Sequence, residues 1–263
     1  MMTEANILRR KKWRMTGVMV ALIVLTYGSA AITKFNIIEG LYAIPSTLAW
    51  MINNLVPSAE TIENIPKVLK RLWETIILSV IASTTAAVFA LLFAILGAQT
   101  TQFNRFFGFV ARFIASIFRN VPVIAWALVL VISFGHNVIT GYFALFFSTF
   151  GFLVRMFIET IDEASSDGVE ALMATGATYF QMVWKGVLPD TMPQMLSWIF
   201  YMIETNIRSA TLVGLLTGTG IGYLFDLYYK KLDYNMLGLI TIMIIAVVFI
   251  IEFTSNKVRK VIS

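Results

Sequence analysis

The sequence predicts an all-α integral membrane protein with about six transmembrane helices. Hydrophobic residues make up 58% of the 263 residues and charged residues only 13%, whereas soluble domains carry about 25% charged residues. Long uncharged runs separate the charges, and a helix needs about 20 largely apolar residues to cross the hydrocarbon core. One water-soluble core could not bury this much apolar surface, so we expect the lipid bilayer to solvate it.

Charged residues mark the ends of the candidate spans. Residues 120–154 are uncharged over thirty-five positions, which is enough for two crossings, and a polar stretch separates them. The nineteen uncharged residues of the first run suit an uncleaved span better than a signal peptide. The expected spans are about 15–33, 75–97, 114–134, 142–158, 192–216 and 234–251.

Basic residues near the first and last spans predict the orientation. The basic N-terminus, residues 1–14, precedes the first span, and Lys257, Arg259 and Lys260 follow the last. Because Lys and Arg gather on the cytoplasmic side, both termini should lie in the cytoplasm, and the chain in the cytoplasmic membrane. Residues 34–74 should then lie outside, with an amphipathic helix over 64–73 on the outer surface. We expect one transmembrane domain over 1–263.

Missing residue types exclude several kinds of site. The chain has no cysteine and a single histidine, His136, which excludes thiolate nucleophiles, Cys-ligated zinc and multi-His metal sites. It has no G-x-x-x-x-G-K-[ST] motif, so we expect no ATP site on this chain. Gly218–Gly222 is better explained as a glycine-rich, bent exit from a membrane helix than as a dinucleotide fingerprint. We expect no catalytic residue and no metal site.

The loop between spans four and five, about 159–190, carries a helix–glycine–helix pattern. Residues 159–175 can form helical turns, Gly176 is a plausible terminator, and residues 177–187 place Phe180, Val183, Trp184 and Val187 at helical spacing. Pro189 and Pro193 mark the entry to span five. Such an elbow could dock into a groove of a partner protein.

This elbow resembles the cytoplasmic signature of permease subunits of bacterial ABC importers, in which Glu-Ala-Ala is followed by a Gly and, after nine intervening residues, by Ile-x-Leu-Pro. Glu170, Ala171, Gly176, Leu188 and Pro189 fit at that spacing. Leu172, Thr175 and Gly186 depart from the pattern. The resemblance implies a type I ABC importer permease fold, with a coupling helix between spans four and five that docks on a separate ATPase.

Two further segments resemble phosphonate-type permeases: Tyr201–Gly214 with Gly220-Ile-Gly222, and Arg119-Asn-Val-Pro122. The resemblance covers about residues 70–250, and we place the core permease region at 70–255. It implies a homodimer that works with an ABC ATPase and an extracytoplasmic substrate-binding protein in the lipid membrane. ATP and Mg would bind the ATPase. No cofactor on this chain and no nucleic-acid partner are expected.

Charges within span five suggest a translocation path. Glu204 and Arg208 are four residues apart with the acid first, the favourable order for a helical ion pair. Charges inside a membrane cost about 2.5–3.5 kcal/mol each on insertion scales, so they rarely face lipid. One hypothesis is that Arg208, with Asn206 and Ser209, lines the path of an anion while Glu204 holds the guanidinium. The alternative is a purely structural ion pair.

Three arginines recur every seven residues at Arg105, Arg112 and Arg119. We expect them to anchor the chain at the lipid headgroups, and the alternative for Arg119 is a place at the inner gate.

Other functions stay open at this stage. The permease could carry phosphate, phosphite or an amino acid instead of phosphonate. A stand-alone channel or proton-coupled carrier is the alternative from another class, and Glu204 would be its titrating acid. The expected pairing of Glu204 with Arg208 argues against a carrier.

Overall fold

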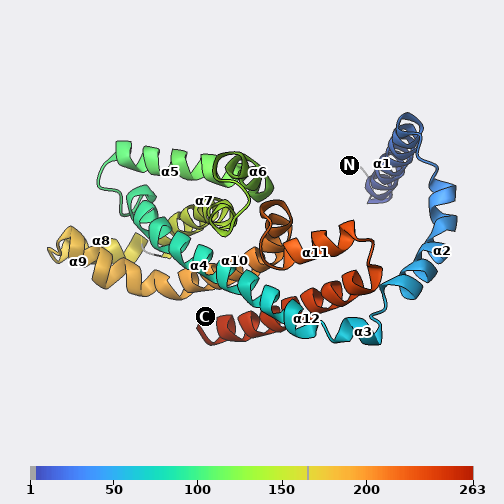
Figure 1. Ribbon diagram of the computed structural model, residues 1–263. Helices are drawn as coiled ribbons and strands as arrows, with labels where there is room; N and C mark the ends of the chain where they lie inside the picture. Colours follow the sequence, from blue (N-terminus) through green and yellow to red (C-terminus); the bar gives the residue numbers. More distant parts are fainter. Residues whose placement is uncertain (1–3, 165, 263) are drawn as a thin grey trace. The chain divides into compact units, whose positions relative to one another are not determined.

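The computed structural model describes residues 4–164 and 166–262, and the chain divides into two compact units, Met1–Asn54 and Leu55–Ser263. Every regular element in these described residues is helical (Figure 1). The first unit contains α1 (Glu4–Thr33) and nearly all of α2 (Ile37–Leu55). The sequence did not predict α2, which lies in a segment expected outside the membrane. A single domain over 1–263 stays a prediction.

The second unit contains the remaining helices. They are α3 (Ala59–Ile62), α4 (Ile65–Gly97), α5 (Arg105–Asn120), α6 (Val123–Phe134), α7 (Val138–Ala164), α8 (Ser166–Ala174), α9 (Tyr179–Gln181), a π-helical turn (Met182–Val187), α10 (Leu188–Thr217), α11 (Gly220–Lys230) and α12 (Tyr234–Ile262).

Helix α7 lies at the centre of the second unit, where α4, α5, α6 and α10 all pack against it. Its Leu145, Leu153 and Phe157 are fully buried. The facing side of α4 carries a stripe of buried alanines: Ala82, Ala86, Ala87, Ala90 and Ala94. Small residues let two helices approach closely, and van der Waals packing then takes the place of the hydrophobic effect inside a membrane. The stripe therefore explains the long α4–α7 contact.

Four helices among the described residues are long and apolar enough to cross a membrane, and the number rises to six if each of two bent helix pairs counts as one span. The four are α1, α4, α7 and α12. The bent pairs are α5 with α6, at 90°, and α10 with α11, at 54°. This range includes the expected six spans.

The third span is not the continuous helix over 114–134 that the sequence predicted. Helix α5 ends at Asn120, Val121 is extended at φ −90° and ψ 119°, and α6 starts at right angles after Pro122. A residue before proline is pushed out of the helical region by a clash with the proline ring. Pro122 therefore turns the chain.

The amphipathic helix predicted for 64–73 is not a separate surface element. It forms the first turns of α4, which runs unbroken from Ile65 to Gly97. Pro66 stands at its start, where a missing N–H costs nothing. No glycine or proline occurs between Lys67 and Leu96, so nothing stops the helix at the expected boundary.

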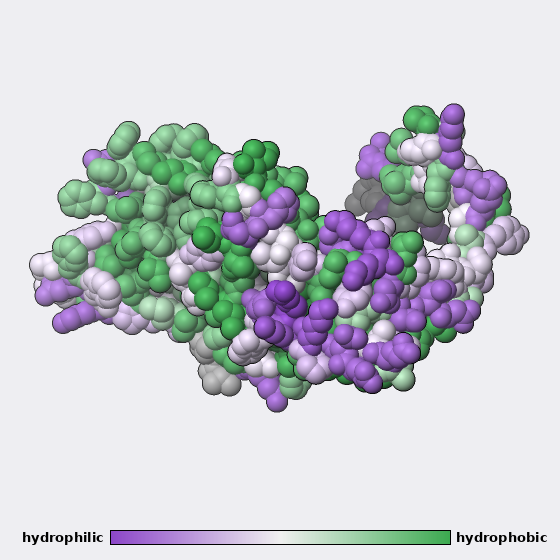
Figure 2. All heavy atoms as spheres, viewed as in Figure 1, coloured by the Kyte–Doolittle hydropathy of each residue, from purple (hydrophilic) through white to green (hydrophobic). Residues whose placement is uncertain are grey.

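The surface of the second unit is divided by polarity. Figure 2 shows hydrophobic residues over α5, where Phe106, Phe109 and Phe113 are all more than half exposed. Hydrophilic residues gather at the α8–α9 end and again around α3 and the start of α4. An apolar surface between two polar ends is the pattern of a protein solvated by lipid.

Candidate functional site

The elbow after α8 turns at a single glycine. Gly176 has φ +81°, in the left-handed region that glycine adopts without strain, and its N–H donates to the Met173 carbonyl at 3.0 Å. Two residues later Thr178 and Gln181 form a capping box, each side chain accepting a hydrogen bond from the other's backbone N–H. The predicted terminator at Gly176 is confirmed, and the turn that follows is well defined.

The helix after the elbow runs into span five without the expected interruption at the prolines. A π-helical turn over Met182–Val187 leads directly into α10, and the Leu188 N–H donates to the Val183 carbonyl five residues back. Pro189 directly follows this wide turn, and Pro193 lies inside α10. The wide turn allows a continuous helix from the elbow into the membrane.

The four apolar side chains of the second elbow helix divide into two pairs. Val183 and Val187 are buried in the α4–α7–α10 core, together with Leu188. Phe180 and Trp184 are 72% and 67% exposed. The same helix is therefore anchored to the membrane core on one side and presents two aromatic rings to a possible partner on the other.

A polar tie fixes the elbow to the loop between α4 and α5. The Tyr179 hydroxyl donates to the Thr101 carbonyl at 2.7 Å, and Asp162 accepts from the backbone N–H and hydroxyl of Thr100 at 3.1 and 2.8 Å. Sequence reasoning missed this tie, because its partners are more than sixty residues apart. These hydrogen bonds connect the elbow and the end of α7 to the loop between α4 and α5.

The other signature residues surround this elbow. Ala171 is exposed on α8, Pro189 is exposed on α10, and Leu188 is buried. Glu170 lies in α8, but its side chain falls outside the described residues.

The predicted ion pair in span five is present. Arg208 donates to Glu204 one helical turn earlier, and a second carboxylate, Glu252 of α12, lies 3.8 Å from the same guanidinium. The Glu204 side chain is 8% exposed, whereas those of Arg208 and Glu252 are about half exposed. The sequence offered no signal for Glu252, because its contact depends on how α10 and α12 cross.

Asn206 does not lie beside Arg208. Its side-chain amide is buried and donates to the hydroxyls of Ser83 on α4 and Thr149 on α7, at 2.9 and 2.7 Å. It therefore holds α10 against both neighbouring helices. Ser209 is half-buried. The structure thus brings Glu204 and Arg208 together and directs Asn206 into the core.

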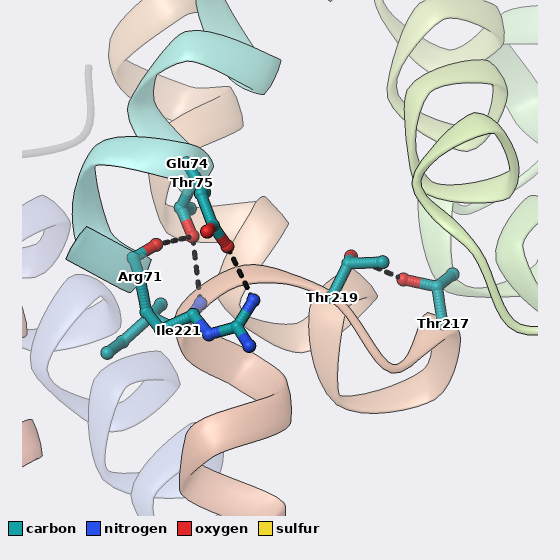
Figure 3. A network of polar contacts seen from close by, with 6 residues as sticks. All are labelled: Arg71, Glu74, Thr75, Thr217, Thr219 and Ile221. Carbon is teal, nitrogen blue, oxygen red and sulfur yellow. Dashed lines mark hydrogen bonds and ion pairs between the residues drawn. The ribbon is translucent and has the colours of Figure 1, made fainter. Parts of the chain in front are cut away.

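A second polar network lies at the other end of α10 (Figure 3). The Thr75 hydroxyl accepts a hydrogen bond from the Ile221 N–H at 2.9 Å and donates to the Arg71 carbonyl at 3.0 Å. Gly218 and Gly220, both at positive φ, shape the turn between α10 and α11. The expected bent exit is confirmed, whereas its tie to α4 was not foreseen. A mostly apolar hollow of about 260 Å³ adjoins this junction, between α4 and the ends of α7, α10 and α11.

Arg119 lies in the last turn of α5 with an exposed side chain, and Arg112 of the same helix donates to the Gly97 carbonyl at 2.6 Å. His136 is exposed in the α6–α7 connection, as expected for a loop residue. No group of three potential metal-ligating side chains is found in the part of the chain that the structure describes.

A family model described as "Binding-protein-dependent transport system inner membrane component" matches residues 86–261. A permease protein assigned to a phosphite transport system of Stutzerimonas stutzeri, HtxC, is 26% identical over 260 residues, which cover 98% of this chain and 90% of the relative. A permease protein assigned to a cryptic phosphonate transport system of Escherichia coli is 33% identical over 117 residues, 44% of this chain and 96% of the relative.

The fold has a counterpart among solved structures. The MetNI methionine ABC transporter, in an inward-facing crystal form, matches with a TM-score of 0.67 at 19% identity, over 76% of this chain and 98% of the transporter chain. At this identity the similarity concerns the fold alone, and it confirms the predicted all-α permease architecture.

Proposed function

The chain belongs to the family of binding-protein-dependent transport system inner membrane components, and from this premise we propose that it translocates phosphonate or a related small phosphorus oxyanion across the cytoplasmic membrane. It is an ABC importer permease by family. The names of the two relatives, one assigned to phosphite and one to phosphonate transport, support the substrate class.

The main structural support for the proposal is the pair of exposed aromatic side chains on the elbow. Phe180 and Trp184 stand exposed on a helix whose opposite side is anchored in the membrane core. Exposed aromatic side chains on a fixed base are typical anchors of a protein interface. We assign the docking of a separate ATPase to this elbow, including Glu170, Ala171, Gly176, Leu188 and Pro189.

In the proposed mechanism, this chain supplies the path and the ATPase supplies the energy. Two copies of the permease form the path on their two-fold axis. Two ATPase copies bind ATP and Mg, close, and pull the elbows together. The tie from Tyr179 to Thr101 passes this motion to α4 and α5. A binding protein delivers the anion at the outer face. Both termini lie in the cytoplasm, and this chain has no enzymatic role.

The charged cluster of α10 fits one wall of the path. Arg208 is half exposed and offers a fork of donors that suits phosphorus oxygens, while the buried Glu204 holds its orientation. Ser209 adds a hydroxyl beside it. Asn206 supports this wall indirectly, because its bonds to Ser83 and Thr149 fix the rotation of α10.

The Glu252 contact favours a second interpretation of the same cluster, a structural brace between α10 and α12. Arg208→Gln separates the two. A path residue predicts lost transport in a complex that still assembles and unfolds at the wild-type temperature. A brace predicts that transport and thermal stability fall together.

The decisive experiment measures ATP hydrolysis by this chain in lipid with its ATPase, with and without binding protein loaded with an alkylphosphonate. Stimulation by the loaded binding protein that is lost in Gly176→Trp supports both the importer and the substrate class. Stimulation by phosphite, phosphate or an amino acid alone contradicts the phosphonate assignment. If no ATPase assembles with the chain, the elbow assignment is wrong.

A further inference from the structure

A small hollow between α5 and α7 is lined by three arginines. Arg112 and Arg119 of α5 and Arg155 of α7 surround a volume of about 60 Å³, with Ser116 adding a hydroxyl. A drug-sized ligand needs about 300 Å³ or more, so this hollow can take only a group the size of a single anion.

The glycine at position 151 explains why the arginines meet. A Cβ there would collide with the backbone nitrogen of Arg119 and lie 2.7 Å from the Phe118 carbonyl carbon. Only glycine therefore lets the end of α5 touch α7. Arg155 follows Gly151 by one helical turn, and Arg112 precedes Arg119 by two, so the contact brings all three onto facing sides.

Two of the arginines are held in place by other groups. Arg112 uses one terminal nitrogen to donate to the Gly97 carbonyl, at the end of α4. Arg155 uses its Nε to pair with Glu159 at 2.5 Å, which leaves its two terminal nitrogens for another acceptor. Both guanidinium groups are thereby positioned before any ligand arrives, which lowers the entropic cost of binding.

The residues that line the hollow carry a net positive charge. They include three arginines and no carboxylate, and Glu159 pairs with Arg155 from outside this lining. Arginine keeps its charge at any physiological pH. Like charges gathered around one hollow repel one another. An anion with several oxygens relieves this repulsion, and planar arginine forks match phosphorus oxygens two at a time.

We propose that this hollow binds a tetrahedral phosphorus oxyanion through Arg119, Arg155 and Arg112. The same chemistry is offered by the headgroup phosphate of an anionic phospholipid and by the free transported anion. Only the second source rests on the proposed function. In the proposed orientation the hollow faces the cytoplasmic side, where either source can reach it.

The test uses the full chain in nanodiscs and has two arms. In the lipid arm, discs of phosphatidylcholine with phosphatidylglycerol are dissolved in detergent, and the retained phosphatidylglycerol is measured by native mass spectrometry. In the free-anion arm, binding of radiolabelled inorganic phosphate is measured in discs of phosphatidylcholine alone. Arg119→Gln and Arg155→Gln are compared with Arg105→Gln, which removes the same charge from α5 outside the hollow.

Loss of one charge-assisted contact should weaken binding by about tenfold. If Arg119→Gln and Arg155→Gln lose phosphatidylglycerol by that factor and Arg105→Gln does not, the occupant is a lipid. If they lose inorganic phosphate by that factor while Arg105→Gln keeps it, the occupant is the free anion.

The proposal is overturned if both hollow variants match Arg105→Gln in both arms. Arg119→Gln and Arg155→Gln change different helices, so a folding defect in one would not explain a loss of binding in both. Gly151→Ala, which should separate α5 from α7, provides a third variant. Neither arm uses the ATPase or the binding protein, so failure here is distinct from failure of the importer assignment.

Discussion

The continuous helix Tyr179–Thr217, which includes α10, is flanked by a glycine turn at each end, and the two turns are built in opposite ways. We name the two ends inner and outer after the proposed orientation. At the inner end, Gly176 has no atom near the position of a Cβ, and Phe180 and Trp184 of the helix that follows are exposed. At the outer end, Gly220 is packed against the Thr75 hydroxyl, which also binds the first turn of α11. The inner turn therefore leads into an exposed aromatic surface, whereas the outer turn is packed against another helix of the same unit.

The difference suggests how a force could act on the helix that carries Arg208. A helix held at one end and contacted by a partner at the other behaves as a lever. Asn206, bonded to α4 and α7, lies between the two ends and close to Arg208 in sequence. Motion applied at the elbow would therefore be converted into a change around the charged cluster.

Removal of the exposed aromatic side chains should have the largest effect. Phe180→Ala and Trp184→Ala should each weaken assembly with the ATPase at least about thirtyfold, because an aromatic anchor at an interface contributes about 2 kcal/mol or more. Thermal unfolding of the permease alone should stay unchanged. Affinity is measured by titrating the ATPase onto the chain in nanodiscs.

The matched control is Tyr229→Ala, which truncates an exposed aromatic near the end of α11. If Tyr229→Ala weakened ATPase binding as much as the elbow substitutions, the elbow would not be the specific docking surface.

Loss of the tie at the outer end should act on stability instead. Thr75→Val leaves the buried Ile221 N–H without its acceptor, which costs about 1–3 kcal/mol. The midpoint of thermal unfolding should fall, and hydrogen exchange at Ile221 should accelerate. Thr84→Val is the control, because this exposed hydroxyl bonds only to carbonyls of its own helix. Unchanged exchange at Ile221 would contradict the role given to Thr75.

Local patterns in the sequence predicted the elements that depend on neighbouring residues. Gly176 terminates a helix, and Glu204 pairs with Arg208 four residues on, since both effects act within one or two turns. The right angle at Val121 was also signalled, because Pro122 restricts the residue before it. The interpretation as one continuous span ignored that signal in favour of length and hydropathy.

Contacts between distant segments could not be predicted in this way. Thr75 with Ile221, Asn206 with Ser83 and Tyr179 with Thr101 join residues separated by 146, 123 and 78 positions. Each depends on helix crossings set by packing, such as the alanine stripe of α4. The sequence around a serine in an apolar run does not show whether its hydroxyl will bond its own helix or a neighbouring helix.

Substituting Gly176 and Gly220 by alanine, one at a time, should separate the cost of backbone strain from the cost of side-chain packing. Both residues have positive φ, so each alanine costs about 1–2 kcal/mol of backbone strain. At Gly220 the new methyl group also collides with the Thr75 hydroxyl, whereas at Gly176 it meets open space. Gly220→Ala should therefore lower the free energy of unfolding by about 1 kcal/mol more than Gly176→Ala. Equal losses, measured by thermal or denaturant unfolding in detergent, would show that the outer turn is not tightly packed.

Removal of the capping box should have the smallest effect on stability, and it tests directly how the inner end works. Gln181→Ala removes the acceptor of the Thr178 N–H, a bond of 2.9 Å at an exposed site, and a cap of this kind contributes about 1 kcal/mol locally. Because Val183 and Val187 still anchor the helix, global unfolding should be unchanged. Hydrogen exchange at Thr178 should rise, and stimulation of ATP hydrolysis by loaded binding protein should fall a few-fold while ATPase affinity is kept. If the elbow contributed only binding affinity for the ATPase, the variant would keep full stimulation of ATP hydrolysis. An elbow that must transmit force needs a stiff connection to its anchor, and for such an elbow affinity and stimulation separate.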